Sequence, residues 1–173
     1  RVGSFLNHPN IVHIFDVGHE ADDLWLVMEH VDGVDMRRLT RRTFVADHPL
    51  SPTTIAAVMI EVLNALEEAH QGGPHRAEPI IHRDLSPENI LVTQTGAVKV
   101  LDFGLAKWSP GQSRVSSLEG KQIIGKTRYM PPEQLKGEFV DARSDLFSLG
   151  IVLYEALTNT LPFGKGDAAE VLA

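Results

Sequence analysis

The stretch from residue 82 to residue 104 constrains this chain more than any other part of its sequence. It opens with the polar loop 82–89 (His-Arg-Asp-Leu-Ser-Pro-Glu-Asn) and closes with Asp-Phe-Gly at 102–104. Between them, residues 90–93 and 97–101 are largely apolar and flank Gln-Thr-Gly, which predicts two short strands joined by a tight turn. Strands of comparable length return the chain close to its start, so we expect Asn89 and Asp102 to lie at one site.

Each of these segments alone says little about function. A lone Asp before a Pro-containing turn usually caps local structure, and Asp-Phe-Gly is short enough to arise by chance. Here the polar loop, the expected hairpin and Asp-Phe-Gly occur in order, and Pro131-Pro132-Glu133 follows them. The combination indicates a functional site.

Periodicity elsewhere predicts a mixed α and β chain. The clearest amphipathic helix follows Ser51-Pro52, because Ser is a good cap and Pro suits the first helical turn. Its apolar residues recur at intervals of three and four up to Ala69. A helix over 141–157 is apolar on most sides from Leu146 onward, so we expect it to be buried. The other expected segments are the end of a helix over 1–8, strands over 11–17 and 24–28, a basic helix over 35–42, loops over 71–79 and 105–128, and a helix that begins near 167.

Composition narrows the class of protein. The 173 residues suffice for one domain with a substantial core, and 43% of them are hydrophobic. The formal net charge of −7 argues against a nucleic-acid-binding protein, which usually has a basic face. The chain has no cysteine, which excludes disulfides and thiolate zinc sites and fits a cytoplasmic location. No apolar run approaches the roughly 20 residues needed to span a bilayer, so we expect no membrane segment.

The motifs together resemble those of protein kinases. Loop 82–89 resembles the catalytic loop, 102–104 the metal-binding Asp-Phe-Gly, and 131–133 the Ala-Pro-Glu that closes the activation segment. The following Gln-Leu is similar to bacterial members of the eukaryotic-type serine/threonine kinases. The resemblance implies an α+β, protein-kinase-like fold, with the end of the small lobe over 1–30 and a truncated large lobe over 31–173.

The resemblance implies an ATP-dependent enzyme that transfers the γ-phosphoryl group to Ser or Thr of a protein substrate. Asp84 is then the catalytic carboxylate that accepts the substrate hydroxyl's hydrogen bond. Asn89 and Asp102 are then ligands of Mg²⁺, with Mn²⁺ as an alternative. Asp145, at the start of an otherwise apolar helix, is expected to hold the catalytic-loop backbone by hydrogen bonds.

The same resemblance implies a nucleotide site. Met28 corresponds to the gatekeeper before the hinge, and backbone groups of Glu29 and Val31 face the adenine edge. Asp35 lies near the ribose, and Leu91 forms the floor under the adenine. Taken alone, Met28 and Leu91 would be assigned to plain core packing.

The chain departs from the family pattern at its ends. The Gly-rich phosphate loop, the strand Lys and the helix Glu that precede these motifs in kinases are not in the sequence. We therefore expect the isolated chain to transfer phosphate poorly or not at all. The Arg that pairs with the equivalent of Glu133 is also absent, so Glu133 is expected to be unpaired. Fusion to other domains in the full-length protein is compatible with this pattern.

A second departure concerns a positive charge. Serine/threonine kinases usually have Lys two residues after the catalytic Asp, where it contacts the γ-phosphate, and this chain has Ser86 there. They usually have Thr in the loop before Ala-Pro-Glu, and this chain has Lys126. Lys126 is therefore a candidate catalytic residue that supplies the charge Ser86 lacks. The alternative is a solvated loop Lys.

Two other classes stay open. One is a pseudokinase, a binding module or scaffold in a kinase fold, although scaffolds often lose one of the residues equivalent to Asp84, Asn89 and Asp102. The other is a small-molecule phosphotransferase of related fold. Such enzymes usually lack the 105–130 segment and the Pro-Pro-Glu closure, so this chain favours a protein substrate.

In the full-length enzyme, Lys126→Met should slow the chemical step far more than Lys121→Met, because only Lys126 is expected to face Asp84. Single-turnover rates of phosphoryl transfer measure this difference. Equal effects of the two substitutions would contradict the role of Lys126.

Overall fold

A computed structural model describes residues 6–20, 23–71, 79–103 and 127–163. Its strands form two antiparallel sheets. One pairs β1 (Ile14–Glu20) with β2 (Asp23–Met28), and the other has the order β3 (Gly33–Asp35), β4 (Ile90–Thr93), β5 (Val98–Val100). The helical elements are α1 (Met36–Val45), α2 (Pro52–Gln71), η1 (Pro87–Asn89), η4 (Thr127–Tyr129), α4 (Pro132–Leu135) and α5 (Ala142–Thr158).

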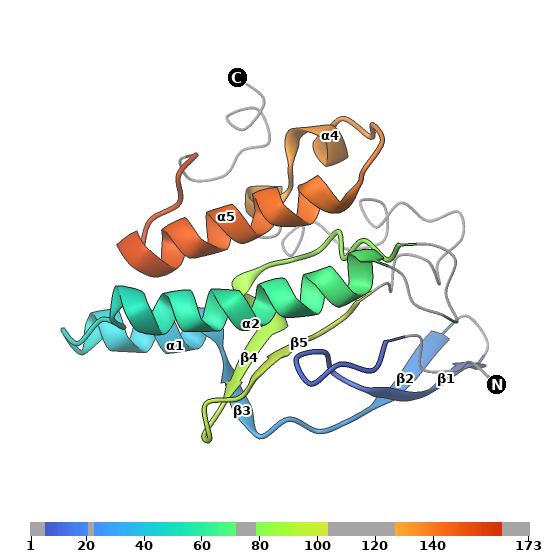
Figure 1. Cartoon of the computed structure of the whole chain (residues 1–173), viewed down its shortest axis with the longest axis horizontal. Coiled ribbons are helices and arrows are strands. Elements are labelled where there is room, and N and C mark those ends of the chain that lie inside the picture. Colours follow the sequence, from blue (N-terminus) through green and yellow to red (C-terminus); the bar gives the residue numbers. More distant parts are fainter. Residues whose placement is uncertain (1–5, 21–22, 72–78, 104–126, 164–173) are drawn as a thin grey trace.

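Helix α2 is the centre of the core. Figure 1 shows α2 crossing the β3–β4–β5 sheet, with α5 running alongside it, and contacts join α2 to both β5 and α5. Ile55, Val62 and Leu66, three of the apolar residues that recur at three and four along α2, are at most 1% exposed. They pack with Ile90 and Val100 of the sheet in one hydrophobic cluster. The amphipathic pattern of α2 therefore places this helix at the centre of the cluster.

Local capping explains where two helices begin. Ser51 Oγ accepts a hydrogen bond from Thr54 N–H at 3.1 Å, and α2 starts at Pro52, as predicted. Asp35 Oδ1 accepts from Arg38 N–H at 2.8 Å, and α1 starts at the next residue. Both caps satisfy backbone donors that the first helical turn leaves without an intrahelical partner.

The β4–β5 hairpin forms as predicted, with Ile90 opposite Val100 and Leu91 opposite Lys99. The chain before β1 joins this sheet, because Val12 N–H donates to Val100 O at 2.9 Å and Val100 N–H donates to Asn10 O at 2.8 Å. This contact explains why β1 begins at Ile14 and not at residue 11. The first residues of the expected strand bond to β5 instead.

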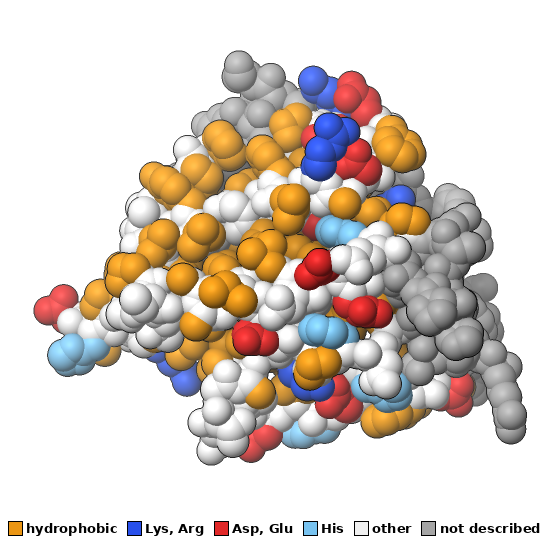
Figure 2. Space-filling model, in the orientation of Figure 1, with side chains coloured by type: hydrophobic (Ala, Val, Ile, Leu, Met, Phe, Trp, Pro, Cys, Tyr) orange, Lys and Arg blue, Asp and Glu red, His pale blue; other side chains and the backbone are white. Residues whose placement is uncertain are grey.

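The expectation that α5 is buried on most sides was wrong in part. One side of α5 packs in the core, but Leu146 on the other side is 48% exposed. Figure 2 shows hydrophobic side chains gathered over α2 and α5. The exposed large hydrophobic residues of these two helices are Ile60, Leu63, Leu146, Tyr154 and Leu157. Sequence hydrophobicity does not say how many sides of a helix find a partner.

Several expected segments lie outside the described residues. These are most of the 1–8 helix end, whose last three residues are described and not helical, most of the 71–79 and 105–128 loops, and the helix near 167. Within the described ranges, no helix has the length and apolar character needed to cross a membrane.

Leu66→Ala should destabilise the fold by about 2–5 kcal/mol, because it leaves a cavity between α2 and its neighbours. Leu63→Ala, one turn earlier on the same helix and 42% exposed, should cost less than about 1 kcal/mol. Denaturant unfolding followed by circular dichroism measures both. Equal losses would contradict the assignment of Leu66 to the core.

Candidate active site

One buried carboxylate, that of Asp145, binds the backbone of the 82–89 loop. Asp145 is 1% exposed. Its Oδ2 accepts from His82 N–H at 2.8 Å, and its Oδ1 accepts from Arg83 N–H at 2.9 Å. Its Oδ2 also lies 2.7 Å from Nε2 of His70, at the end of α2. The expectation that Asp145 holds this loop by hydrogen bonds is therefore confirmed.

His82 is packed as a neutral ring. Burial lowers the pKa of His82, and this outweighs the opposing attraction of Asp145 and other nearby acids. Its Nε2 lies 2.8 Å from the carbonyl oxygen of Leu101, which only accepts, so Nε2 carries the proton. Nδ1 is then free to accept from Asp84 N–H at 3.3 Å. The His82 ring also meets Phe103 edge-on, with centroids 4.7 Å apart.

The structure brings Asn89 beside both Asp84 and the end of the hairpin. Asn89 Nδ2 donates to Asp84 O at 2.7 Å and lies 3.4 Å from Asp84 Oδ2. Leu101 N–H donates to Asn89 O at 2.9 Å, which places Asp102 next to this pair along the chain. The convergence expected from the hairpin is present. Because the amide nitrogen of Asn89 is used by Asp84, its side-chain oxygen is the atom left to bind a cation.

Backbone strain marks the same place. Arg83 and Asp102 have φ values of 66° and 62°, in the left-handed region that non-glycine residues rarely adopt. Such residues persist where surrounding contacts hold them, and they cluster at functional sites. Here the contacts are the Arg83 bond to Asp145 and the pairing of Leu101, next to Asp102, with Asn89.

The donor set suits a hard divalent cation. Within the described ranges, no three His, Cys, Asp or Glu side chains gather as a metal-binding cluster. Asn89 and Asp102 offer one amide and one carboxylate oxygen donor. Mg²⁺ is commonly bound in this way, by one or two protein oxygen ligands with substrate phosphates and water completing the shell. The residues present therefore fit a nucleotide-bound Mg²⁺ better than a metal held by protein alone.

The candidate nucleotide residues lie on three strands, β2, β3 and β4, and on the segment that follows β2. Asp35 of β3 pairs in register with Leu91 of β4, so the residues expected at the ribose and under the adenine share one row of the sheet. Met28 ends β2 and is 37% exposed. Val31 is half-buried in the following segment. Asp35, one of the five predicted residues, also has a structural role, because its side chain caps the N-terminus of α1.

The side chain of Lys99, which the sequence did not indicate as a site residue, lies next to Glu29. Lys99 Nζ donates to Glu29 Oε1 at 2.6 Å, and His13 N–H donates to the same oxygen at 2.9 Å. Burial acts to raise the pKa of the Glu29 carboxyl, but the hydrogen bonds from Lys99 and His13 outweigh it and hold that pKa below its usual value. Glu29 N–H bonds to His13 O, so its carbonyl is the backbone group left for a nucleotide. Lys99 lies opposite Leu91 in the β4–β5 hairpin. The register of the predicted hairpin is therefore the signal in the sequence that could have placed Lys99 near the candidate nucleotide residues.

Two further expectations have different outcomes. Glu133 was expected to lack its Arg partner, and the partner that the structure gives its carboxylate is the Ser144 hydroxyl, which donates to Oε1 at 2.5 Å. Lys126 lies outside the described residues. Ser86, which it was expected to complement, is 2% exposed, and its hydroxyl has no hydrogen-bond partner within the described part of the chain.

Comparison with known families identifies the family to which this chain belongs. The model of the protein kinase domain family matches residues 2–172. The chain belongs to the protein kinase family. Its mixed content of helices and a small sheet fits the α+β, kinase-like fold expected from the sequence. Loop 82–89 is accordingly called the catalytic loop below.

The curated relatives are bacterial kinases. The chain is 41% identical to a probable serine/threonine-protein kinase of Streptomyces coelicolor, over 97% of this chain and 24% of the relative. It is 41% identical to the serine/threonine-protein kinase PknB of Mycobacterium tuberculosis, over 94% of this chain and 25% of the relative. The chain therefore spans about a quarter of the length of the curated relatives it matches.

Asp145→Asn should destabilise this kinase domain by about 2 kcal/mol or more, because an amide group then faces donors that a carboxylate satisfied. Asp141→Asn is the control, since Asp141 lies at the exposed start of the same helix and Asn is an equally good cap. Thermal unfolding measures both variants. Loss of stability in Asp141→Asn alone would contradict the anchoring role of Asp145.

Proposed function

We propose that the full-length protein is an ATP-dependent serine/threonine protein kinase, which transfers the γ-phosphoryl group of ATP to Ser or Thr of protein substrates. The observation that carries the proposal is the convergence of Asp84, Asn89 and the Asp102 end of the hairpin on a loop anchored by Asp145. The relatives' printed names, serine/threonine-protein kinases, support the same class.

The residue roles follow from the chemistry of this transfer. Asp84 accepts the hydrogen bond of the substrate hydroxyl and orients it toward the phosphoryl group. Asn89 and Asp102 hold Mg²⁺, or Mn²⁺ in its place. The bound cation neutralises charge on the phosphates. Rigid placement matters most here, because catalysis of phosphoryl transfer rests on positioning and electrostatics. The anchored catalytic loop supports that requirement.

The nucleotide is proposed to bind along the hinge and the β3–β4 row. Met28 borders the site, the carbonyl of Glu29 and the backbone of Val31 face the adenine edge, Leu91 supports the base, and Asp35 lies at the ribose. The register pairing of Asp35 with Leu91 supports a continuous surface for base and sugar. The Lys99 ion pair with Glu29 supports a fixed hinge.

Lys126 is proposed to supply the positive charge near Asp84 that kinases usually take from a catalytic-loop Lys. The support is chemical, since the catalytic loop has the neutral Ser86 at that position. Lys at position 126 lies one residue before η4, whose Tyr129 lines a recess together with Asp84.

Residues 1–30 are proposed to belong to the small lobe and residues 31–173 to the large lobe, with the hinge between them. The relatives are about four times as long as this chain, which supports further domains in the full-length protein. A cytoplasmic location is proposed because ATP is the phosphoryl donor and the chain has no cysteine. Protein substrates and ATP are the proposed partners.

Full-length protein with radiolabelled ATP, Mg²⁺ and casein should give label on serine and threonine, found by phosphoamino-acid analysis. Asp84→Asn should lower the rate by about a hundredfold or more, because the hydroxyl loses its orienting carboxylate. Asp16→Asn, at an exposed position of β1, should leave the rate unchanged.

Other results distinguish the alternatives. Wild-type protein that binds ATP but transfers no label to casein or to itself would favour the pseudokinase. Label on tyrosine alone would overturn the serine/threonine assignment. An Asp84→Asn variant as active as the Asp16→Asn control would overturn the role of Asp84.

A further inference from the structure

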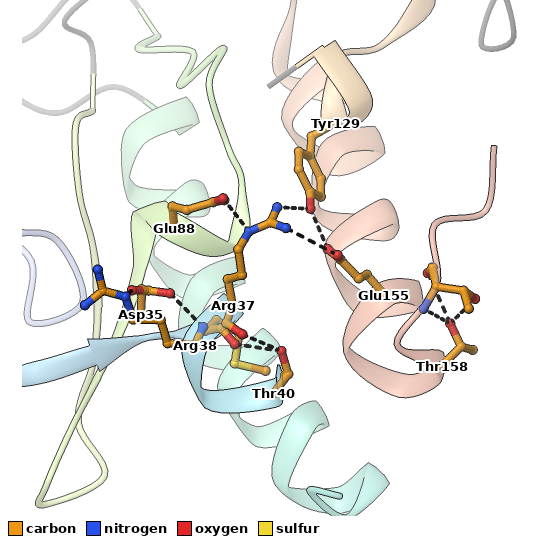
Figure 3. A network of polar contacts seen from close by, with 10 residues as sticks. Asp35, Arg37, Arg38, Thr40, Glu88, Tyr129, Glu155 and Thr158 are labelled. Atoms are coloured by element: carbon orange, nitrogen blue, oxygen red, sulfur yellow. Dashed lines mark hydrogen bonds and ion pairs between the residues drawn. The ribbon is translucent and has the colours of Figure 1, made fainter. Parts of the chain in front are cut away.

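One arginine outside the recognised motifs joins four elements of the domain. Figure 3 shows Arg37 of α1 between Glu88, Tyr129 and Glu155. Its Nε forms an ion pair with Glu88, and its Nη2 donates to the Tyr129 hydroxyl. Its Nη1 lies 3.7 Å from Glu155 Oε1. The Tyr129 hydroxyl in turn donates to Glu155 Oε2 at 2.5 Å. A single guanidinium therefore links α1, the catalytic loop, η4 and α5.

The charges in this network are stable at neutral pH. Burial acts to lower the pKa of Arg37, but Tyr129, Glu88 and Glu155 outweigh it and raise that pKa. Burial raises the pKa of Tyr129, and its bond to Glu155 raises it further. Arg37 thus stays charged, and Tyr129 keeps the proton that it donates. The Arg37 guanidinium also lies 5.6 Å from the centroid of the Tyr129 ring.

Two partners of Arg37, Glu88 and Tyr129, lie next to residues that are proposed to take part in phosphoryl transfer. Glu88 immediately precedes the metal-ligand candidate Asn89 within η1, a helix of three residues. Tyr129 is 2% exposed, and Ser148 Oγ donates to its carbonyl oxygen at 2.7 Å. A small recess between the catalytic loop and η4 is lined by Arg83, Asp84, Leu85, Tyr129, Met130 and Ser148. The Arg37 network therefore includes one residue of this lining, Tyr129, and reaches the catalytic loop at Glu88, outside the lining.

The strength of the network depends on its geometry. An isolated surface ion pair contributes little to stability, and the Arg37 and Glu88 side chains are 35% and 46% exposed. The Arg37 guanidinium differs from such a pair, because ordering one side chain serves a hydrogen bond to Tyr129 and two ion pairs. Its loss should affect the relative placement of the elements more than the overall stability.

We propose that Arg37 is a positioning residue for phosphoryl transfer. By holding Glu88 against Tyr129 and Glu155, it keeps the catalytic loop and the η4 wall at one distance and orientation, and so keeps Asn89 and Asp84 aligned. Arg37 touches neither nucleotide nor acceptor. The proposal rests on the proposed kinase function, because alignment matters only if the loop performs catalysis.

Kinetics of the full-length protein test this role against a matched control. Arg37→Ala should lower kcat about ten- to a hundredfold, since small misplacements of catalytic groups are costly, while KM for ATP changes little. Glu88→Gln should have a similar effect, and the double variant should be no slower than the worse single one. Arg41→Ala, exposed on the same helix, should match wild type.

The alternatives give different kinetic results. Equal kcat in Arg37→Ala and Arg41→Ala would overturn the proposal, as would multiplying losses in the double variant. A higher rate of the Arg37→Ala variant that is confined to lysine-containing peptide substrates would also overturn the proposal. Arg37 would then be a residue that blocks access of a basic substrate to Glu88 and Glu155.

A measurement independent of catalysis separates this proposal from the proposed function. Hydrogen exchange of residues 82–93 and 127–135 should be faster in Arg37→Ala than in Arg41→Ala, with α2 unchanged. Unchanged exchange in both segments would overturn the positioning role even in an active enzyme. Absence of phosphoryl transfer in wild type would refute only the proposed function. If Arg37→Ala does not fold, Glu88→Gln gives the same test, because it removes the Arg37–Glu88 ion pair by changing its more exposed partner.

Discussion

The buried carboxylate of Asp145 is the interaction on which the catalytic loop depends. A charge at 1% exposure is tolerated only when donors surround it, and here the donors are the backbone of His82 and Arg83 and the ring of His70. These groups come from the catalytic loop and from α2, while Asp145 belongs to α5. The polar requirement of one side chain therefore fixes the loop to the two helices that form the core.

The second constraint is the return of the chain through β4 and β5. The pairing of Leu101 with Asn89 closes the hairpin, and the Leu101 carbonyl accepts a hydrogen bond from Nε2 of His82. The left-handed backbone at Arg83 is held by its N–H bond to Asp145, and that at Asp102 follows the hydrogen-bonded residue Leu101. Rigidity here suits phosphoryl transfer, in which a protein contributes mainly by placing groups in advance.

Shared cations connect these elements to the rest of the domain. Lys99 joins the hinge residue Glu29 to the hairpin, and Arg37 joins Glu88 of the catalytic loop to Tyr129 and Glu155. In each case a cation from one element binds carboxylates or hydroxyls from elements distant in sequence. The elements that carry the proposed nucleotide and acceptor sites are therefore joined by side chains outside the family motifs.

The sequence by itself determined the features that local chemistry controls. The hairpin between Asn89 and Asp102, the cap at Ser51, and the need of Asp145 for donors all follow from neighbouring residues, because turns, caps and buried charges have short-range requirements. The motif order was sufficient to predict the kinase fold.

Only the tertiary structure decided which distant groups meet. Arg37 and Tyr129 are 92 positions apart, and Lys99 and Glu29 are 70 apart. Ser144 was a partner for Glu133 that no local pattern indicated, and the exposed side of α5 depends on which elements pack against it. Periodicity states which side of a helix is apolar, whereas packing decides what covers that side and which charges come together.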